Sequence, residues 1–334
     1  MLLTTACRTE RAPTAPPPAA NLPGESTTSE QPHDKLIDRA QEDIYEGVWR
    51  SAMHVDRLFG STQPDVAYAQ ASGSIAPAFL WDQFNGPHLL LRFHADTPLP
   101  QLNERFSAFL GRFNPDEYIA ESAPNSGAFP NSFNPLLEDQ TLFGIAYHQP
   151  PTQGGRFDAS LGMHVALPLD PYVKGAYVYE RGQPRTGVFG WREIAFWENS
   201  LGGFGVTSRL DLERLLSQSL LVHWTGSVTR AQHSYGWQSF STFDVVYAYS
   251  TRRALDLQLE IDGSSEASVP LHDFGAKLAY RRSIARDWLV LETRASIEWP
   301  RDVPAQQRKV SLGIGVGVEM FFGTDEFLAR PVTF

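Results

Sequence analysis

The stretch KVSLGIGVGVEMFFG, residues 309–323, alternates between apolar and other residues along its whole length. Successive side chains of a β-strand point to opposite faces, so this pattern predicts a strand with two unlike faces. The apolar face carries Val310, Leu312, Ile314, Val316, Val318, Met320 and Phe322. Glu319 and three glycines lie on the other face, where we expect the glycines to leave room for neighbouring side chains. The apolar face must meet either a protein core or lipid.

The same period of two recurs from about residue 65 onward, and the connections indicate how the strands are joined. Long connections at 300–309 and 262–270 alternate with short turns at 284–287 and 250–252. Alternating short turns and longer loops are typical of an outer-membrane β-barrel. The candidate strands are 67–82, 87–95, 104–113, 139–148, 157–167, 172–181, 185–198, 203–212, 219–231, 237–249, 253–262, 272–282, 288–299 and 309–323.

Aromatic residues gather where these strands end, as expected for rings at the two interfaces of a membrane. We expect Trp197, Trp237, Tyr249, Trp288, Trp299 and Phe322 to form such girdles. The sequence therefore predicts an all-β fold, an antiparallel up-and-down transmembrane barrel of about twelve strands, with ten or fourteen as alternatives. The expected location is the bacterial outer membrane.

Composition excludes several other classes of protein. The chain has 334 residues and a net charge of −10, which argues against a nucleic-acid-binding protein. Mean hydropathy is −0.28, and no run reaches the roughly 18 apolar residues of a spanning helix. Cys7 is the one cysteine, so an intramolecular disulfide framework and a Cys-rich metal site are excluded.

The amino-terminal part has a different character from the barrel. Residues 1–33 combine a short MLLTTAC start with a Pro-, Ser- and Thr-rich arm, which predicts a remnant of an export signal followed by a disordered linker. Cys7 is a candidate for lipidation. Apolar residues at helical spacing over 34–60 predict a periplasmic amphipathic helix. The barrel is expected to span 61–323, and 324–334 form a tail.

Three stretches carry a resemblance to a known family: FGVTSRLDLERLL (204–216), YRRSIARDWLVLETRASIEWPRD (280–302) and LGIGVGVEMFFG (312–323). They resemble an uncharacterised family of proteobacterial outer-membrane β-barrel proteins. In that family a Trp follows a charged turn, a Trp-Pro-Arg-type loop follows the next strand, and an alternating strand ending in Phe-Gly closes the chain. The resemblance is specific from about residue 196 onward. It implies a fold and a compartment, and it supplies no catalytic residues.

Charged residues on the polar faces of the C-terminal strands are the best candidates for function. Opposite signs on adjacent strands suggest cross-strand ion pairs. Two interpretations stay open: a structural network that fills a narrow barrel, or the lining of a solute path. The predicted lumen residues are Arg209, Asp211, Asp256, Glu260, Lys277, Arg281, Glu292, Arg294, Glu298 and Glu319.

A catalytic alternative rests on His223 and Thr225, which lie on one strand face in VHWTGS. A His-x-Ser pair of this kind serves outer-membrane lipases, with His as base and the hydroxyl as nucleophile. No spacing of His, Asp or Glu predicts a metal site, and no cofactor is expected.

We therefore expect a non-enzymatic outer-membrane protein, either a narrow channel or a structural barrel. Its expected partners are outer-membrane lipid and the machinery that inserts barrels. The alternatives are an outer-membrane lipid hydrolase and a secreted β-sandwich that binds a ligand.

Overall fold

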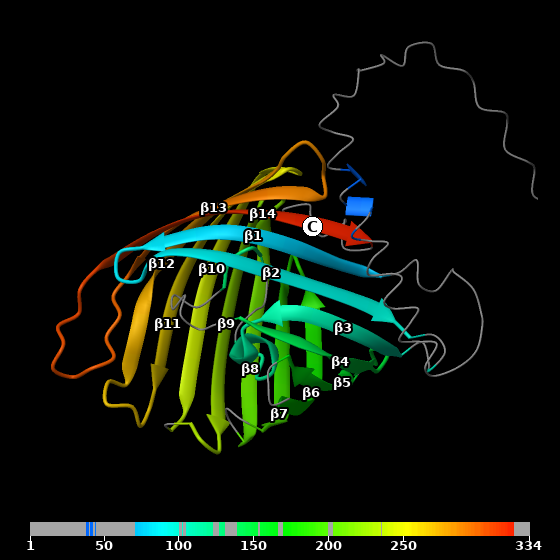
Figure 1. Cartoon of the computed structure of the whole chain (residues 1–334), viewed down its shortest axis with the longest axis horizontal. Helices are drawn as coiled ribbons and strands as arrows, with labels where there is room; N and C mark the ends of the chain where they lie inside the picture. The colour runs from blue at the N-terminus through cyan, green and yellow to red at the C-terminus, as the bar shows by residue number, and fades with distance from the viewer. Residues whose placement is uncertain are drawn as a thin grey trace, which may run out of the picture.

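The computed structural model describes one closed antiparallel barrel (Figure 1). The described residues are 38–39, 41–42, 44, 71–99, 102, 105–122, 127–130, 139–152, 154–165, 170–199, 203–234 and 236–323. Cys7, the arm over 1–33, the tail over 324–334 and most of the predicted helix over 34–60 lie outside them. The described residues between 38 and 44 are helical.

Fourteen strands form the described part of the barrel, and each pairs with its neighbours in chain order until β1 meets β14. The bounds are β1 Ser72–Asp82, β2 Gly86–Pro98, β3 Phe106–Phe113, β4 Gln140–His148, β5 Arg156–His164, β6 Asp170–Gln183, β7 Gly187–Glu198, β8 Gly203–Ser217, β9 Leu220–Ala231, β10 Gln238–Ser250, β11 Arg253–Ser264, β12 Leu271–Ser283, β13 Leu289–Glu298 and β14 Ser311–Gly323. One short helix, α2 at Pro115–Tyr118, lies between β3 and β4.

The predicted up-and-down barrel is confirmed, with fourteen strands in place of about twelve. Each candidate segment of the sequence overlaps one strand. The count was low because the connections around β6 are short at both of its ends, so they do not separate strands as clearly as the later loops do. The closed sheet excludes the β-sandwich alternative, because a sandwich consists of two sheets packed face to face.

The two ends of the barrel differ. The first residue of β1, Ser72, and the last residue of β14, Gly323, lie at one end of the barrel, together with the tight turns β8–β9 and β10–β11. We name this the turn end. The long connections β3–β4 and β13–β14 lie at the other end, which we name the loop end. The turn between β1 and β2 is tight because the Asp82 carboxylate accepts hydrogen bonds from the Phe84 and Asn85 amides, and Gly86 has a φ of +80°.

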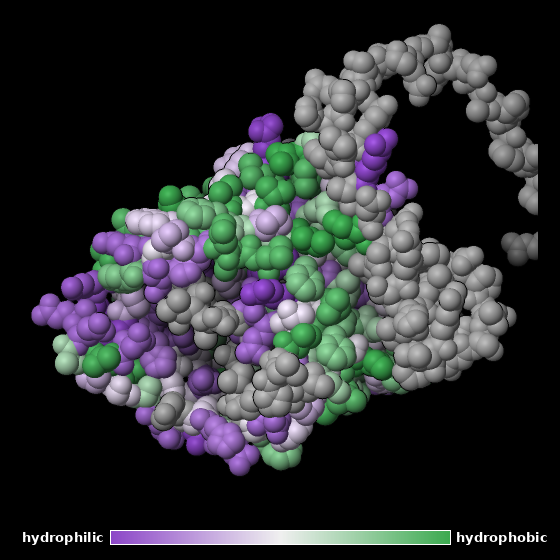
Figure 2. All heavy atoms as spheres, in the orientation of Figure 1, coloured by the Kyte–Doolittle hydropathy of each residue, from purple (hydrophilic) through white to green (hydrophobic). Residues whose placement is uncertain are grey.

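Burial in this barrel is the reverse of that in a water-soluble protein. On β11, Leu259 is 49% exposed on the outside, whereas the next residue, Glu260, is 2% exposed on the inside. In Figure 2, hydrophobic side chains gather over the strands, and hydrophilic ones gather at the loop end near the β13–β14 connection. An apolar exterior on a closed sheet, which leaves no free strand edge, is what a lipid environment requires. The molecule is a transmembrane β-barrel, which confirms the predicted outer-membrane location.

Among the described residues, no helix has the length and apolar character needed to span a membrane.

The expected interfacial aromatics lie at the strand ends. Trp197, Trp237 and Trp299 lie at the loop end, and Tyr249 and Trp288 lie at the turn end. Phe322 needs a correction, because its side chain is only 1% exposed and does not face an interface. Its ring lies over Gly73 of β1, where a Cβ atom would come within 2.5 Å of the ring. Because Gly73 has no side chain, the Phe322 ring can occupy this space.

Leu259→Arg would place a charge on the lipid-facing side near the middle of β11. We expect the free energy of folding into a bilayer to become less favourable by about 2–4 kcal/mol. The measurement is equilibrium urea unfolding in lipid vesicles. Val303→Arg is the matched control, since Val303 is also exposed but lies in the β13–β14 connection. Equal losses for the two variants would contradict the assignment of the β11 face to lipid.

Candidate functional site

The described parts of the connection between β3 and β4 lie inside the barrel. They are residues 114–122, which include α2, and residues 127–130, together with Asp139; we name them the inward segment. Figure 1 shows α2 within the ring of strands. Residues such as Phe129 and Ile119 are almost completely buried although they belong to a connection, because the barrel wall surrounds them.

Arg92 of β2 holds the inward segment to one wall of the barrel. Its Nη1 donates a hydrogen bond of 2.8 Å to the Phe129 carbonyl oxygen. Its Nη2 lies 3.2 Å from Glu117 Oε2, and its Nε lies 3.4 Å from Asp139 Oδ2. Burial and the nearby Glu117 raise the pKa of Asp139 to about 6, although Arg92 acts in the opposite direction. One guanidinium therefore joins three separate points of the segment, which its five donors allow.

Arg294 of β13 supports the same part of the segment from the neighbouring side of the wall. Its Nη1 donates to the Pro130 carbonyl oxygen at 2.8 Å, and its guanidinium lies 4.7 Å from the centre of the Phe129 ring. The ring packs over the glycines of β14. A Cβ atom on Gly315 would lie 2.7 Å from the ring, and one on Gly317 would lie 2.8 Å from the Ala128 methyl group. The lumen space predicted from the glycines is thus occupied by Ala128 and Phe129.

The other part of the segment attaches to the opposite wall, on β6, β7 and β9. Lys174 Nζ donates to the Tyr118 carbonyl oxygen at 2.7 Å and to Glu121 Oε1 at 2.9 Å. Arg192 Nη1 lies 3.1 Å from Glu121 Oε2. The Ser227 hydroxyl donates to the Ser122 carbonyl oxygen at 2.5 Å. Because one part of the segment is held by β2 and β13 and the other by β6, β7 and β9, the segment crosses the lumen and narrows it.

A cavity of about 930 Å³ lies on the loop-end side of the inward segment. Residues of α2, of the β13–β14 connection and of the nearby ends of β9–β13 line it. Its acidic lining residues are Glu117, Glu260, Asp262, Asp273, Glu298 and Asp302, and its basic ones are Arg301 and Lys309. Two of these carboxylates pair with lumen cations, Glu117 with Arg92 and Glu260 with Lys277. Four carboxylates then face two basic side chains, so the described lining has an excess of negative charge.

The predicted lumen residues point inward, and most of them form ion pairs. Glu260 Oε2 and Lys277 Nζ, both buried, lie 2.6 Å apart between β11 and β12. Asp256 lies on the inward face of β11 with Glu260, and Glu298 lies on the inward face of β13 with Arg294. Three further pairs connect Arg209 to Asp211 at 2.7 Å, Arg281 to Glu319 at 2.8 Å and Arg294 to Glu292 at 3.4 Å.

The catalytic candidates lie inside the same polar network. Thr225 is 0% exposed, and its hydroxyl donates to Asp211 Oδ1 at 2.8 Å. The Thr225 hydroxyl lies 3.2 Å from His223 Nε2, and His223 Nδ1 is 3.7 Å from Asp244 Oδ2. The hydroxyl proton points to a carboxylate instead of the imidazole, and the residue faces away from lipid. This arrangement holds strands β8, β9 and β10 together.

Sequence reasoning missed the residues that hold the inward segment, apart from Arg294. Lys174 is the one charge on the inward face of YVKGAYV, and Arg92 shares the inward face of LLLRFHAD with Leu90, His94 and Asp96. An isolated inward charge in a strand gives a weak signal, because its partner belongs to a connection with no periodic pattern. The long stretch between the candidate strands 104–113 and 139–148 was the other feature that could have indicated a segment inside the lumen.

Comparisons with known proteins give likeness of fold only. No family model matches the chain, and no curated protein matches it. Among solved structures, the outer membrane channel DcaP of Acinetobacter baumannii is 9% identical with a TM-score of 0.47, over 75% of this chain and 96% of that one. OccK11 of Pseudomonas aeruginosa is 10% identical with a TM-score of 0.41, over 75% and 96%. The KdgM porin is 8% identical with a TM-score of 0.35, over 75% and 99%. At these values the likenesses carry no argument about function.

Gly315→Ala tests the packing of Phe129. The new methyl group meets the ring, so we expect the inward segment to lose about 1–3 kcal/mol of docking free energy and to detach more often. The measurement is the rate at which a Glu-specific protease cleaves the folded protein at Glu117 or Glu121. Gly190→Ala on β7 is the control, since its Cβ would stay 3.3 Å from the nearest atom. Unchanged cleavage in Gly315→Ala would refute this packing.

Glu121 lies in the β3–β4 connection and makes the docking depend on pH. Burial would raise the pKa of Glu121, but Lys174 and Arg192 outweigh burial and hold the pKa below its ordinary value of 4.5. The folded pKa is depressed, so this contribution to stability is present above pH 4.5 and is lost as the pH falls through the folded pKa.

We expect hydrogen exchange in residues 114–122, corrected for intrinsic rates, to rise on acidification. Glu121→Gln should raise it already at neutral pH and abolish the dependence below pH 4.5. Glu193→Gln is the control, because Glu193 bonds to Trp191 and Ser208 and not to the segment. A Glu121→Gln protein with the wild-type acid response would contradict the assignment.

Proposed function

We propose that this protein is a narrow, non-enzymatic channel of the bacterial outer membrane. The observation that carries the proposal is the inward segment, which crosses the lumen and is fixed to opposite walls by Arg92 and Lys174. A barrel with such a segment has a restricted passage instead of a wide pore. We also infer membership of the uncharacterised proteobacterial outer-membrane barrel family, on the C-terminal stretches quoted above. Outer-membrane lipid and the barrel-insertion machinery are the partners that this function requires.

The channel is expected to prefer cations. A solute that enters from the loop end meets the cavity whose lining includes Asp262, Asp273 and Asp302. Excess negative charge in a confined space raises the local concentration of cations. Farther into the lumen, the basic side chains that hold the inward segment already bind carbonyl oxygens and carboxylates. We therefore expect these basic side chains to repel a passing cation only weakly.

Lipid hydrolysis is the less favoured function. The Thr225 hydroxyl is buried in the wall, away from lipid, and donates its proton to the Asp211 carboxylate. A structural barrel whose lumen is closed by the inward segment is the second candidate, and the experiment below separates it from a channel.

Planar-bilayer recordings of the purified protein test the proposal. We expect small, stable conductance steps and, in a KCl gradient, a reversal potential that indicates preference for K⁺ over Cl⁻. Asp262→Asn combined with Asp273→Asn should lower this preference, because both carboxylates line the cavity. Arg92→Ala should increase the conductance and its fluctuations, because the segment loses three contacts.

Arg252→Ala is the control for Arg92→Ala, since Arg252 lies exposed in the β10–β11 turn and, within the described part of the chain, its side chain pairs with Asp287. Absence of conductance in both the wild type and Arg92→Ala, with correct folding shown by a heat-modifiable gel shift, would refute the channel and favour the structural barrel.

A further inference from the structure

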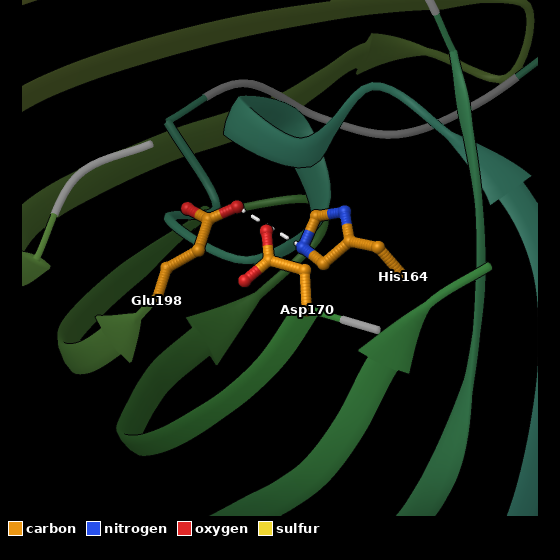
Figure 3. Close-up of side chains that lie close together, drawn as sticks. All are labelled: His164, Asp170 and Glu198. Carbon is orange, nitrogen blue, oxygen red and sulfur yellow. Dashed lines mark ion pairs between the residues drawn. The ribbon is translucent and has the colours of Figure 1, made fainter. Parts of the chain in front are cut away.

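Three acidic or basic side chains meet at the loop ends of β5, β6 and β7. His164 is the last residue of β5, Asp170 is the first of β6, and Glu198 is the last of β7. Strand register places His164 opposite Asp170, and Glu198 opposite Tyr172. The three side chains are 1%, 8% and 5% exposed, and their ligating atoms lie within 4.8 Å of one another. Figure 3 shows the imidazole ring and the two carboxylates converging on a shared space.

Gln140 fixes the orientation of the His164 imidazole ring. His164 Nδ1 lies 2.5 Å from Gln140 Oε1, which can only accept a hydrogen bond, so Nδ1 carries a proton. The other nitrogen, Nε2, is 3.0 Å from Glu198 Oε1. Within the described residues, neither of these two atoms takes part in a hydrogen bond. A buried imidazole nitrogen and a carboxylate oxygen at this separation are stabilised by a positive charge shared between them, supplied by a proton or by a metal ion.

We propose that His164, Asp170 and Glu198 bind a divalent transition-metal ion, with Zn²⁺ as the representative ion. One imidazole nitrogen and two carboxylate oxygens form a donor set that suits such ions. Gln140 serves as the outer partner that fixes the tautomer of the histidine, a common arrangement around metal-bound imidazole. Sequence spacing predicted no metal site, because Glu198 lies far along the chain from His164 and Asp170 and only the pairing of β6 with β7 brings it to them.

The ion would strengthen the wall against which the inward segment docks. The Tyr172 ring packs edge-on against the His164 ring with centroids 5.8 Å apart. Tyr172 belongs to the buried cluster against which Tyr118, the last residue of α2, also packs. Joining the ends of three strands at this point would hold the Tyr172 and Tyr118 rings in place. The site is thus structural and separate from the cation-preferring cavity.

Titration of the full-length protein, stripped with a chelator and kept in detergent, tests the proposal. We expect one equivalent of Zn²⁺ to bind in calorimetry and Co²⁺ to give the visible absorption of a low-symmetry site. Glu198→Gln and Asp170→Asn should each weaken Zn²⁺ binding at least about tenfold, and Gln140→Ala by about 10–100-fold. His148→Gln is the control, because the His148 side chain pairs with Asp158 and lies at the turn end, the opposite end of the barrel from the proposed site. This variant should bind Zn²⁺ as the wild type does.

A second measurement needs no variant. Zn²⁺ should raise the midpoint temperature of the heat-modifiable gel shift of the wild-type protein, and a chelator should reverse the rise. No stoichiometric binding by the wild type would overturn the proposal. Binding that His164→Gln and Glu198→Gln leave unchanged, in proteins that still show the gel shift, would overturn it equally and would indicate an adventitious ion only.

Discussion

The lumen of this barrel is organised by the attraction between strand cations and a chain segment that passes between the walls. Arg92, Lys174, Arg192 and Arg294 each direct donors at carbonyl oxygens or carboxylates of that segment. A connection buried inside a protein needs partners for its backbone polar groups, and an empty apolar lumen would supply none. The guanidinium and ammonium groups supply these partners. In turn, the carbonyl oxygens and carboxylates offset the desolvation penalty that a buried cation without a partner would carry. Removing the segment would deprive these four cations of carbonyl and carboxylate partners, and removing the cations would deprive the segment of the donors that hold it to the walls.

The polar interior and the apolar exterior follow from the same constraint. In lipid the outside must carry Leu259 and similar residues, so charged groups such as Glu260 and Lys277 lie inside. There they are close enough to pair, as Glu260 and Lys277 do. The network around Asp211, which accepts from Thr225 and Arg209, uses the same chemistry to join strands. Ion pairing, lumen narrowing and the proposed cation preference therefore have one origin in the arrangement of charge. Fixed pairs neutralise the attachment, and the cavity lining keeps carboxylates that have no ion-pair partner among the described residues.

Strand positions and facing could be predicted because the period of two is a local property. Glu319 and its neighbouring glycines were assigned correctly to the lumen side of β14, and the rims carry Trp197 and Tyr249 as expected. Phe322 was assigned wrongly, because the space above Gly73 belongs to another strand and is invisible in the alternation. His164 and Glu198 could not be connected before the register was known. Each failure concerns a contact between residues far apart in the chain.

The amino-acid sequence by itself determined the compartment and the architecture: strands with one apolar face, short turns at one end, and charges that must face inward. These follow from side-chain alternation and from the cost of charge in lipid, which act residue by residue. Only the tertiary structure decided what fills the lumen. The stretch 114–139 has no periodic pattern. The inward position of its described parts depends on Arg92 and Lys174, which contact them from opposite walls, and on Gly315, which leaves room for Phe129. These contacts form only once the barrel has closed, because they join the inward segment to strands that are far from it in the sequence.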